Sequence, residues 1–228
     1  MNASLDSVLQ HPGIWRGDQL AQPDVDTLST GFAELDEQLP GGGWPRGALT
    51  EILIEREGIG ELRLLLPALV QASEQNSWLA WVAPPHLPYA PALAAAGVKL
   101  KHLLVASPQS VGDAWWTTEQ ALRSGACSAV LSWLNSPDER RMRRLQLGAE
   151  SGRAWGVLFR SAKAAEERSP AALRLRLEAT QRGLAVHILK RRGGQLSRPV
   201  MVDLYAGKAV RRAPVLSVVP SLRAAAPR

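Results

Sequence analysis

The chain has 228 residues and a mass of 24.7 kDa, which is room for one sizeable domain with terminal extensions. Hydrophobic residues make up 46% and charged residues 21%, which excludes a wholly disordered chain, and no apolar run approaches the roughly 20 residues of a membrane span. The first residues lack the basic and apolar regions of a signal peptide, and the single cysteine, Cys127, excludes a disulfide framework and a multi-cysteine metal site. We therefore expect a soluble protein of a reducing compartment, the cytoplasm.

The net charge of +6 is unevenly distributed. Residues 1–139 hold 7 basic and 16 acidic side chains, whereas residues 140–228 hold 20 basic and 5 acidic ones. Such asymmetry indicates a polyanion or an acidic partner for the C-terminal half. The alternative is an arginine-rich composition spread over solvated helix faces.

Residues 1–28 are predicted to form an N-terminal arm, with a short helix at residues 5–9. Prolines and glycines interrupt the periodicity of the arm, so little of it can bury itself. Trp15 is a large apolar side chain in this polar segment and needs a docking surface, on its own core or on a partner. Trp15 and the neighbouring Arg16 are therefore candidate partner-binding residues.

Residues 29–205 alternate between short apolar runs and amphipathic segments, which is typical of a core domain. Strands are predicted at residues 48–54, 78–83, 103–105, 129–134 and 156–159. Helices are predicted at residues 32–39, 62–73, 90–96, 113–124 and 137–151. Three more strands, at residues 173–180, 184–190 and 199–204, follow without intervening helices. The pattern predicts an α/β fold, a mostly parallel sheet flanked by helices with antiparallel C-terminal strands at one edge, followed by a flexible basic tail rich in Ala, Pro and Arg at residues 206–228.

The turn after the first core strand, residues 55–62, is where a protein of this class would bind a nucleotide phosphate. A phosphate loop needs converging backbone N–H groups, a Lys for the terminal phosphates, and a Ser or Thr hydroxyl for Mg²⁺. Here Gly58 and Gly60 are followed by Glu61 and Leu62, and three carboxylates in the turn repel phosphate. We expect a degenerate loop that binds no cofactor.

Two other positions needed for ATP hydrolysis also carry unsuitable residues. The fourth predicted strand ends in Trp133 and Leu134 instead of a metal-binding Asp, and the second is followed by Pro85 and His86 instead of a catalytic Glu. The four histidines lack metal-ligand spacing, no Gly-x-Ser-x-Gly motif occurs, and Cys127 is expected to be a buried, inert thiol. We expect no enzymatic activity, no cofactor and no metal.

Two groups of residues are candidates for partner contacts. Trp115 and Trp116 open a predicted helix, where one ring must face the core and the other becomes a hot-spot candidate. The second group is basic, and for it a solvated surface and a nucleic-acid or acidic-partner surface both stay open. It consists of Arg140, Arg141, Arg143, Arg144, Lys190, Arg191 and Arg192.

Residues 29–36 (STGFAELD) and 39–52 (LPGGGWPRGALTEI) resemble the entry to the RecA core, and this likeness covers about residues 30–205. With the element at residues 11–17 (HPGIWRG), the chain resembles the ImuA family of translesion DNA synthesis-associated proteins, in which a degenerate phosphate loop is usual. The segment at residues 160–170 falls where RecA grips DNA, but it is short and glycine-free and its charges nearly cancel, which argues against RecA-like binding of DNA.

This resemblance implies a non-enzymatic accessory factor of damage-induced (SOS) translesion synthesis and mutagenesis, cytoplasmic and associated with the nucleoid. The implied partners are RecA and ImuB, an inactive homologue of Y-family polymerases, and indirectly an error-prone DNA polymerase. A weak DNA contact and self-association through the arm are further expectations. More distantly, the chain resembles the SulA family of SOS cell-division inhibitors, RecA-like cores without an ATP site that bind the division GTPase FtsZ. The alternatives are therefore a SulA-like division inhibitor or a basic nucleic-acid-binding module.

Overall fold

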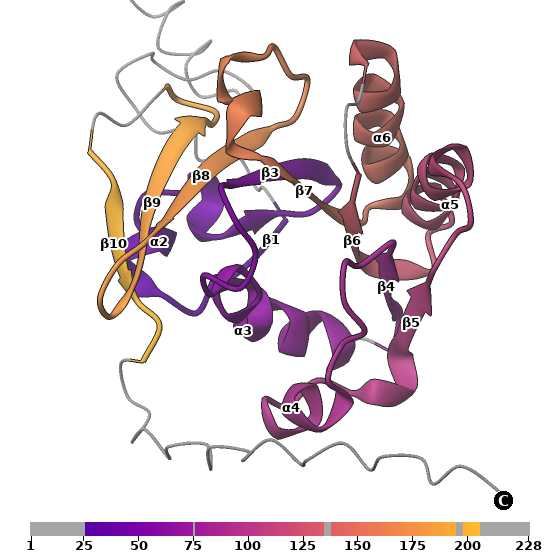
Figure 1. Cartoon of the computed structure of the whole chain (residues 1–228), viewed down its shortest axis with the longest axis horizontal. Helices are drawn as coiled ribbons and strands as arrows, with labels where there is room; N and C mark the ends of the chain where they lie inside the picture. Colours follow the sequence, from indigo (N-terminus) through magenta and orange to yellow (C-terminus); the bar gives the residue numbers. More distant parts are fainter. Residues whose placement is uncertain (1–25, 75, 135–137, 195–197, 206–228) are drawn as a thin grey trace, which may run out of the picture.

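Figure 1 shows a computed structural model of the chain, which describes residues 26–74, 76–134, 138–194 and 198–205. The predicted arm helix, Trp15, Arg16 and the C-terminal tail lie outside the described residues. The N-terminal elements are β1 (Thr27–Leu28), α2 (Ala33–Asp36), the 3₁₀ turn η1 (Pro40–Gly42) and β2 (Trp44–Pro45). The central elements are β3 (Ala48–Ile54), α3 (Glu61–Glu74), β4 (Trp78–Val82), α4 (Ala90–Ala95), η2 (Leu100–His102), β5 (Leu103–Ala106), α5 (Val111–Arg123), β6 (Cys127–Trp133), α6 (Glu139–Gly152) and β7 (Trp155–Ser161). The C-terminal elements are η3 (Ala162–Glu166), β8 (Leu173–Ala179), β9 (Gly183–Lys190) and β10 (Val200–Asp203).

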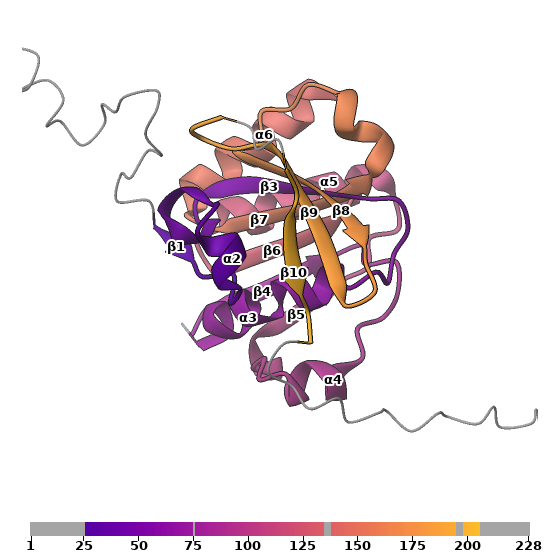
Figure 2. The same cartoon turned by 90° about the vertical axis from the view of Figure 1, so that its left-hand side faces the viewer.

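A central sheet of eight strands in the order β10-β9-β8-β3-β7-β6-β4-β5 carries the fold. The pairs from β8 to β5 are all parallel, whereas β9 is antiparallel to both β8 and β10. Figure 2 looks onto the edge formed by β9 and β10. All seven residues of β3 are buried, as expected of a strand covered on both faces. The carboxyl ends of the parallel strands all point the same way, so the turns after β3, β4, β6 and β7 lie close together.

The predicted α/β class is confirmed, with helices on both faces and antiparallel strands at one edge. One strand differs from the prediction: β8 was expected to be antiparallel but is parallel to its neighbour β3, with Thr50 opposite Leu173. The connection from β7 to β8 therefore crosses over β3, and it does so through η3 and irregular backbone instead of a helix. The predicted helix at 32–39 shrinks to the single turn α2, because Leu39 is extended (φ −95°, ψ 139°) and Gly41 has a φ of 75°.

Side-chain caps set the starts of the two helices on one face of the sheet. The Ser110 hydroxyl accepts a hydrogen bond from the Asp113 N–H at 3.0 Å, so α5 begins at Val111, two residues earlier than predicted. The Asp138 carboxylate accepts one from the Arg141 N–H at 2.7 Å, so α6 begins at Glu139, two residues later than predicted.

Two hydrophobic cores lie on opposite faces of the sheet, because successive strand residues point to opposite sides. Ile52 and Ile54 belong to the core under α3 and α4, whereas Leu49 belongs to the core under α5 and α6. The last two helices pack closely, since a Cβ atom on Gly152 would overlap the carbonyl oxygen of Leu122. Among the described residues, no helix is both long and apolar enough to cross a bilayer.

A small antiparallel ribbon pairs β1 with β2, and the chain between these two strands belongs mostly to the segments that resemble the RecA entry. The Asp36 carboxylate accepts hydrogen bonds from the Thr30 N–H (2.8 Å) and the Ser29 hydroxyl (2.7 Å), which fixes the turn before α2. A Cβ on Gly43 would overlap the carbonyl oxygen of Leu28, so glycine is needed where β1 approaches. Leu28, which the sequence placed in the arm, is thus paired with the core.

Candidate functional site

The turn between β3 and α3 is closed by the first residue of the following helix. The Gly58 N–H donates to Glu61 Oε1 at 2.9 Å and the Gly60 N–H donates to Glu61 Oε2 at 3.0 Å. Both glycines have a positive φ (78° and 113°), which turns their N–H groups toward the N-terminus of α3, where an anion is favoured. Glu61 is only 6% exposed. The carboxylate predicted to repel phosphate therefore occupies the N–H groups that would have bound one.

A second side chain packs on the same turn from the far end of the chain. A Cβ on Gly60 would lie 2.5 Å from Leu204 Cδ1, so Leu204, just after β10, covers this glycine. Tyr205 follows, and the guanidinium of Arg63 lies 4.5 Å from the centre of its ring. Leu62, at the Ser/Thr position of a phosphate loop, packs against the hydrophobic core. The residues of this turn do not fit a nucleotide phosphate.

The neighbouring strand ends carry aromatic and paired side chains. Trp133, at the end of β6, stacks on Phe159 with ring centres 4.7 Å apart. His86, after β4, lies with Nε2 3.3 Å from a carboxylate oxygen of Glu57. A cavity of about 560 Å³ opens between these strand ends and the turn after β3. Its lining includes an aromatic surface, and among the described residues no group of three His, Cys, Asp or Glu side chains could hold a metal ion.

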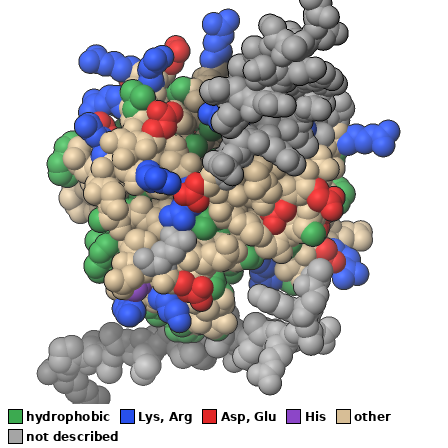
Figure 3. All heavy atoms as spheres, turned by 180° about the vertical axis from the view of Figure 1, so that it is seen from behind, with side chains coloured by type: hydrophobic (Ala, Val, Ile, Leu, Met, Phe, Trp, Pro, Cys, Tyr) green, Lys and Arg blue, Asp and Glu red, His purple; other side chains and the backbone are tan. Residues whose placement is uncertain are grey.

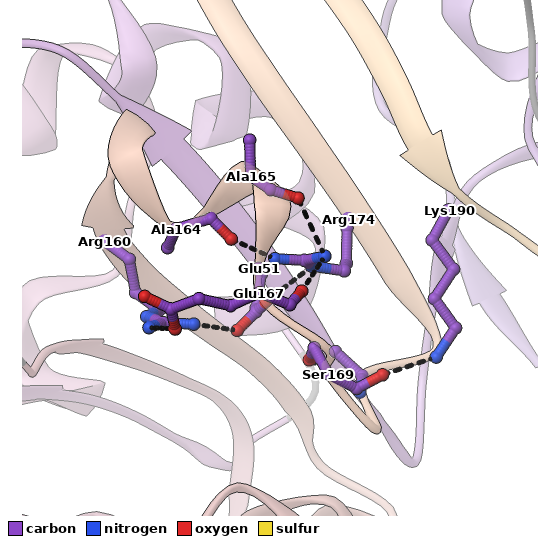
Figure 4. A network of polar contacts seen from close by, with 9 residues as sticks. Glu51, Arg160, Ala164, Ala165, Glu167, Ser169, Arg174 and Lys190 are labelled. Atoms are coloured by element: carbon purple, nitrogen blue, oxygen red, sulfur yellow. Dashed lines mark hydrogen bonds and ion pairs between the residues drawn. The ribbon is translucent and has the colours of Figure 1, made fainter. Parts of the chain in front are cut away.

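A buried ionic network fastens the crossover between β7 and β8 to the sheet (Figure 4). Glu51 on β3 is fully buried and pairs with Arg160 Nη1 on β7 at 2.9 Å and with Arg174 Nε on β8. Arg160 also reaches Glu167 at 2.5 Å, and Arg174 donates to the carbonyl oxygens of Ala164 (2.7 Å) and Glu167 (2.8 Å). The segment that falls where RecA grips DNA is therefore held against its own sheet.

The basic residues at the end of β9 are also bound to the chain. Lys190 Nζ donates to the carbonyl of Ser169 at 2.7 Å (Figure 4), and Arg191 donates to the carbonyls of Gln38 and Gly194. Burial, followed by the nearby charge of Arg174, lowers the pKa of Lys190, and burial lowers the pKa of Arg191. These contacts indicate a structural role for both side chains.

The structure brings four of the predicted residues together in a groove between α5 and α6. Trp115 is buried (6% exposed) and Trp116 is exposed (62%), so the prediction of one inward and one outward ring is confirmed. Both rings line the groove, with a volume of about 180 Å³, together with Arg141 and Arg144 of α6. Arg191 and Arg192 line a different cavity, with Gln146 and Glu150 of α6, so the predicted basic residues form two separate groups.

Sequence reasoning missed several residues of these sites. Glu51, Arg160 and Arg174 are charged residues within apolar strands. Because a buried charge needs a partner, this pattern could have indicated that the three side chains pair with one another. Glu119, buried on α5, pairs with Arg144 at 2.6 Å and with Arg123 at 3.5 Å. The contact of Leu204 with Gly60 joins residues far apart in the sequence, so no local sequence pattern could have predicted it.

A mostly parallel sheet of this order, with a strand–turn–helix phosphate position closed by a carboxylate, defines a RecA-like α/β domain whose nucleotide site is filled by its own side chains. The family model described as cell division inhibitor SulA matches residues 47–156. SulA from Serratia marcescens is 30% identical over 118 residues, which span 52% of this chain and 70% of that protein. The chain belongs to the SulA family.

Other relatives are matched over different shares of their length. SulA from Edwardsiella piscicida is 38% identical over 99 residues, 43% of this chain and 59% of that protein. RecA from Symbiobacterium thermophilum is 35% identical over 118 residues, 50% of this chain but only 33% of that protein. The crystal structure of SulA from Pseudomonas aeruginosa is matched at 28% identity and a TM-score of 0.42, over 49% of this chain and 97% of that one. The chain thus covers between one third and about two thirds of these curated relatives.

Proposed function

We propose that this protein is a non-enzymatic factor of the SOS response that works through protein contacts. The observation that supports this most directly is the Glu61 carboxylate on the N–H groups of Gly58 and Gly60, because it removes the anion site on which ATP chemistry depends. Calorimetric titration with Mg-ATP should give no saturable heat at micromolar concentrations, and no phosphate should be released. Saturable binding or turnover would overturn the non-enzymatic role.

The first candidate role is inhibition of cell division, through binding of the division GTPase FtsZ. Membership of the SulA family supports this role, and the matched segment includes β3 to β6 and the α5–α6 surface. Expression in a rod-shaped bacterium should then produce filamentous cells. Purified protein should lower the light scattering of FtsZ assembling with GTP in proportion to its concentration. Normal cell length at high expression, with unchanged FtsZ assembly, would exclude this role.

The second candidate role is that of an accessory factor in translesion synthesis, with RecA and ImuB as partners. This role is favoured by the elements that lie outside the family-matched residues 47–156. These elements, the β1–β2 ribbon and the strands β8 to β10, are packed into the same core as the matched segment. Residues 29–36 and 39–52, which resemble the RecA entry, include α2, η1, β2 and most of β3, whereas the element at residues 11–17 lies outside the described residues. Deleting the gene should then lower damage-induced mutation frequency without changing cell length, and the protein should co-purify with ImuB after nuclease treatment. An unchanged mutation frequency would exclude this role, so the two candidates are separated by two independent phenotypes.

A further inference from the structure

The outer face of α5 and α6 combines an exposed aromatic ring with arginines in one groove. The two helices run side by side, and glycines on α6 allow the close approach: a Cβ on Gly148 would lie 3.1 Å from the Arg123 side chain. The resulting groove is lined by Gly112, Trp115, Trp116, Glu119, Arg141, Arg144 and Leu145. Seen from behind, several basic side chains lie over this part of the molecule, with hydrophobic and acidic ones between them (Figure 3).

The tryptophans give the groove an apolar surface. Trp116 exposes 62% of its surface, so its ring is available to a partner, and tryptophan is one of the residues enriched in binding hot spots. Trp115 lies beneath the guanidinium of Arg141, 5.7 Å from the ring centre, and its buried indole N–H has no acceptor among the described residues. The exposed ring of Trp116 is therefore the part of the groove on which an apolar side chain of a partner can pack.

The four arginines of α6 fall into two kinds. Arg144 is held by the buried Glu119 at 2.6 Å, and Arg141 by Asp138 at 3.6 Å, so these two are oriented by their own chain. Arg140 and Arg143, on the exposed side of α6, have no carboxylate partner within the described part of the chain. Arg140 and Arg143 do not line the groove but lie on the exposed surface of α6 beside it, so a segment that crosses α6 into the groove would meet two unpaired guanidinium groups and then an apolar ring. Spaced carboxylates next to an apolar side chain complement this arrangement.

We propose that the α5–α6 groove binds an acidic segment of a partner protein. Carboxylates of this segment pair with Arg140 and Arg143, and an apolar side chain packs on Trp116. Asp113, Asp138 and Glu139 lie at the helix starts that border the groove, so a continuous polyanion would meet repulsion there, whereas spaced carboxylates need not. A protein segment is therefore favoured over nucleic acid, and this holds whichever of the two cellular roles applies.

The test is fluorescence anisotropy with the full chain and a short labelled peptide rich in Asp and Glu around a central Leu-Phe pair. We expect saturable binding that Trp116→Ala weakens by about tenfold or more, and that the double variant R140E/R143E abolishes. Binding should disappear when Asn and Gln replace the acidic residues of the peptide. The matched controls are Tyr89→Ala, which removes another exposed aromatic ring, and K99E/K101E, which reverses two exposed charges away from the groove. Both controls should bind the peptide as the parent does.

Three results would overturn the proposal. The first is the absence of binding to the acidic peptide. The second is equal loss of affinity in the groove variants and in the matched controls. The third is tighter, Arg140- and Arg143-dependent binding of a labelled oligothymidylate, which would assign the surface to nucleic acid. Thermal melting of each variant checks that it is folded. We expect every variant to fold, because all the substituted side chains are exposed.

Discussion

At the scale of single residues, one side chain changes what the strand–turn–helix motif does. The Glu61 carboxylate and the N–H groups of Gly58 and Gly60 form an internal version of the contact that a phosphate loop makes with its nucleotide. A bound nucleotide orders such a turn only while it is present, whereas Glu61 orders it permanently. The RecA-like framework is thereby kept without the ligand that usually organises it.

Replacing this carboxylate tests its role directly. Glu61→Ala should lower the free energy of unfolding by about 1–3 kcal/mol, because the N–H groups of the exposed Gly58 and the half-buried Gly60 lose a charged acceptor. Inorganic phosphate should then raise the melting temperature of the variant but not that of the parent, since the emptied N–H groups accept an anion. The matched control is Glu74→Ala at the exposed end of α3, which should be nearly neutral. An unchanged urea midpoint for Glu61→Ala would contradict the proposed role.

The single cysteine gives a prediction with a definite sign in pH. Cys127, which was expected to be buried, is half-buried; this partial burial raises the pKa of its thiol, and the hydrogen bond from Ser124 opposes the rise more weakly. A raised pKa means that the folded protein holds its proton more tightly, so this group contributes stability below the ordinary thiol pKa and loses it as the pH rises beyond. Alkylation by iodoacetamide at pH 8 should therefore be slow in the native protein and fast in urea. The thiol should titrate at a lower pH in the unfolded chain than in the native one.

At the scale of elements, the close packing of α5 and α6 depends on glycines of α6. Gly152→Ala should lower the free energy of unfolding by about 1–3 kcal/mol, because the added methyl group would overlap the Leu122 carbonyl and push the helices apart. Gly112→Ala in α5 is the matched control, since its Cβ would meet nothing closer than 3.7 Å. In that helical position alanine should be neutral or slightly stabilising. Chemical denaturation of both variants measures the difference, and equal costs would show that the helix contact is not tight.

At the scale of the whole molecule, Glu51 joins the family-matched segment to the strands that follow it. Glu51 lies within residues 47–156, whereas Arg160 and Arg174 lie beyond them. Glu51→Gln should lower the free energy of unfolding by about 3–5 kcal/mol, because it leaves two buried guanidinium groups short of a carboxylate. Hydrogen exchange should increase first in the crossover containing η3, which the network holds.

A partly exposed ion pair provides the comparison for Glu51. Glu178 lies 2.7 Å from Arg176 and 3.1 Å from His187, and about 44% of its side chain is exposed. Glu178→Gln should cost only about 0–1 kcal/mol, because solvent screens the pair. Similar losses for Glu51→Gln and Glu178→Gln in urea denaturation would contradict the buried network as the main link between the two parts.

The amino-acid sequence by itself determined the order of strands and helices along the chain and the unsuitable phosphate turn. It also determined that one of the two rings, Trp115 or Trp116, is buried and the other exposed. These features depend on local properties: the periodicity of apolar residues, the chemistry of neighbouring side chains, and the rotation of about 100° between successive residues on a helix. Only the tertiary structure decided that β8 pairs in parallel with β3, that Leu204 covers Gly60, and that Glu51 holds two arginines from other strands. Each of these contacts joins residues separated by many positions, and their geometry depends on how the whole sheet assembles.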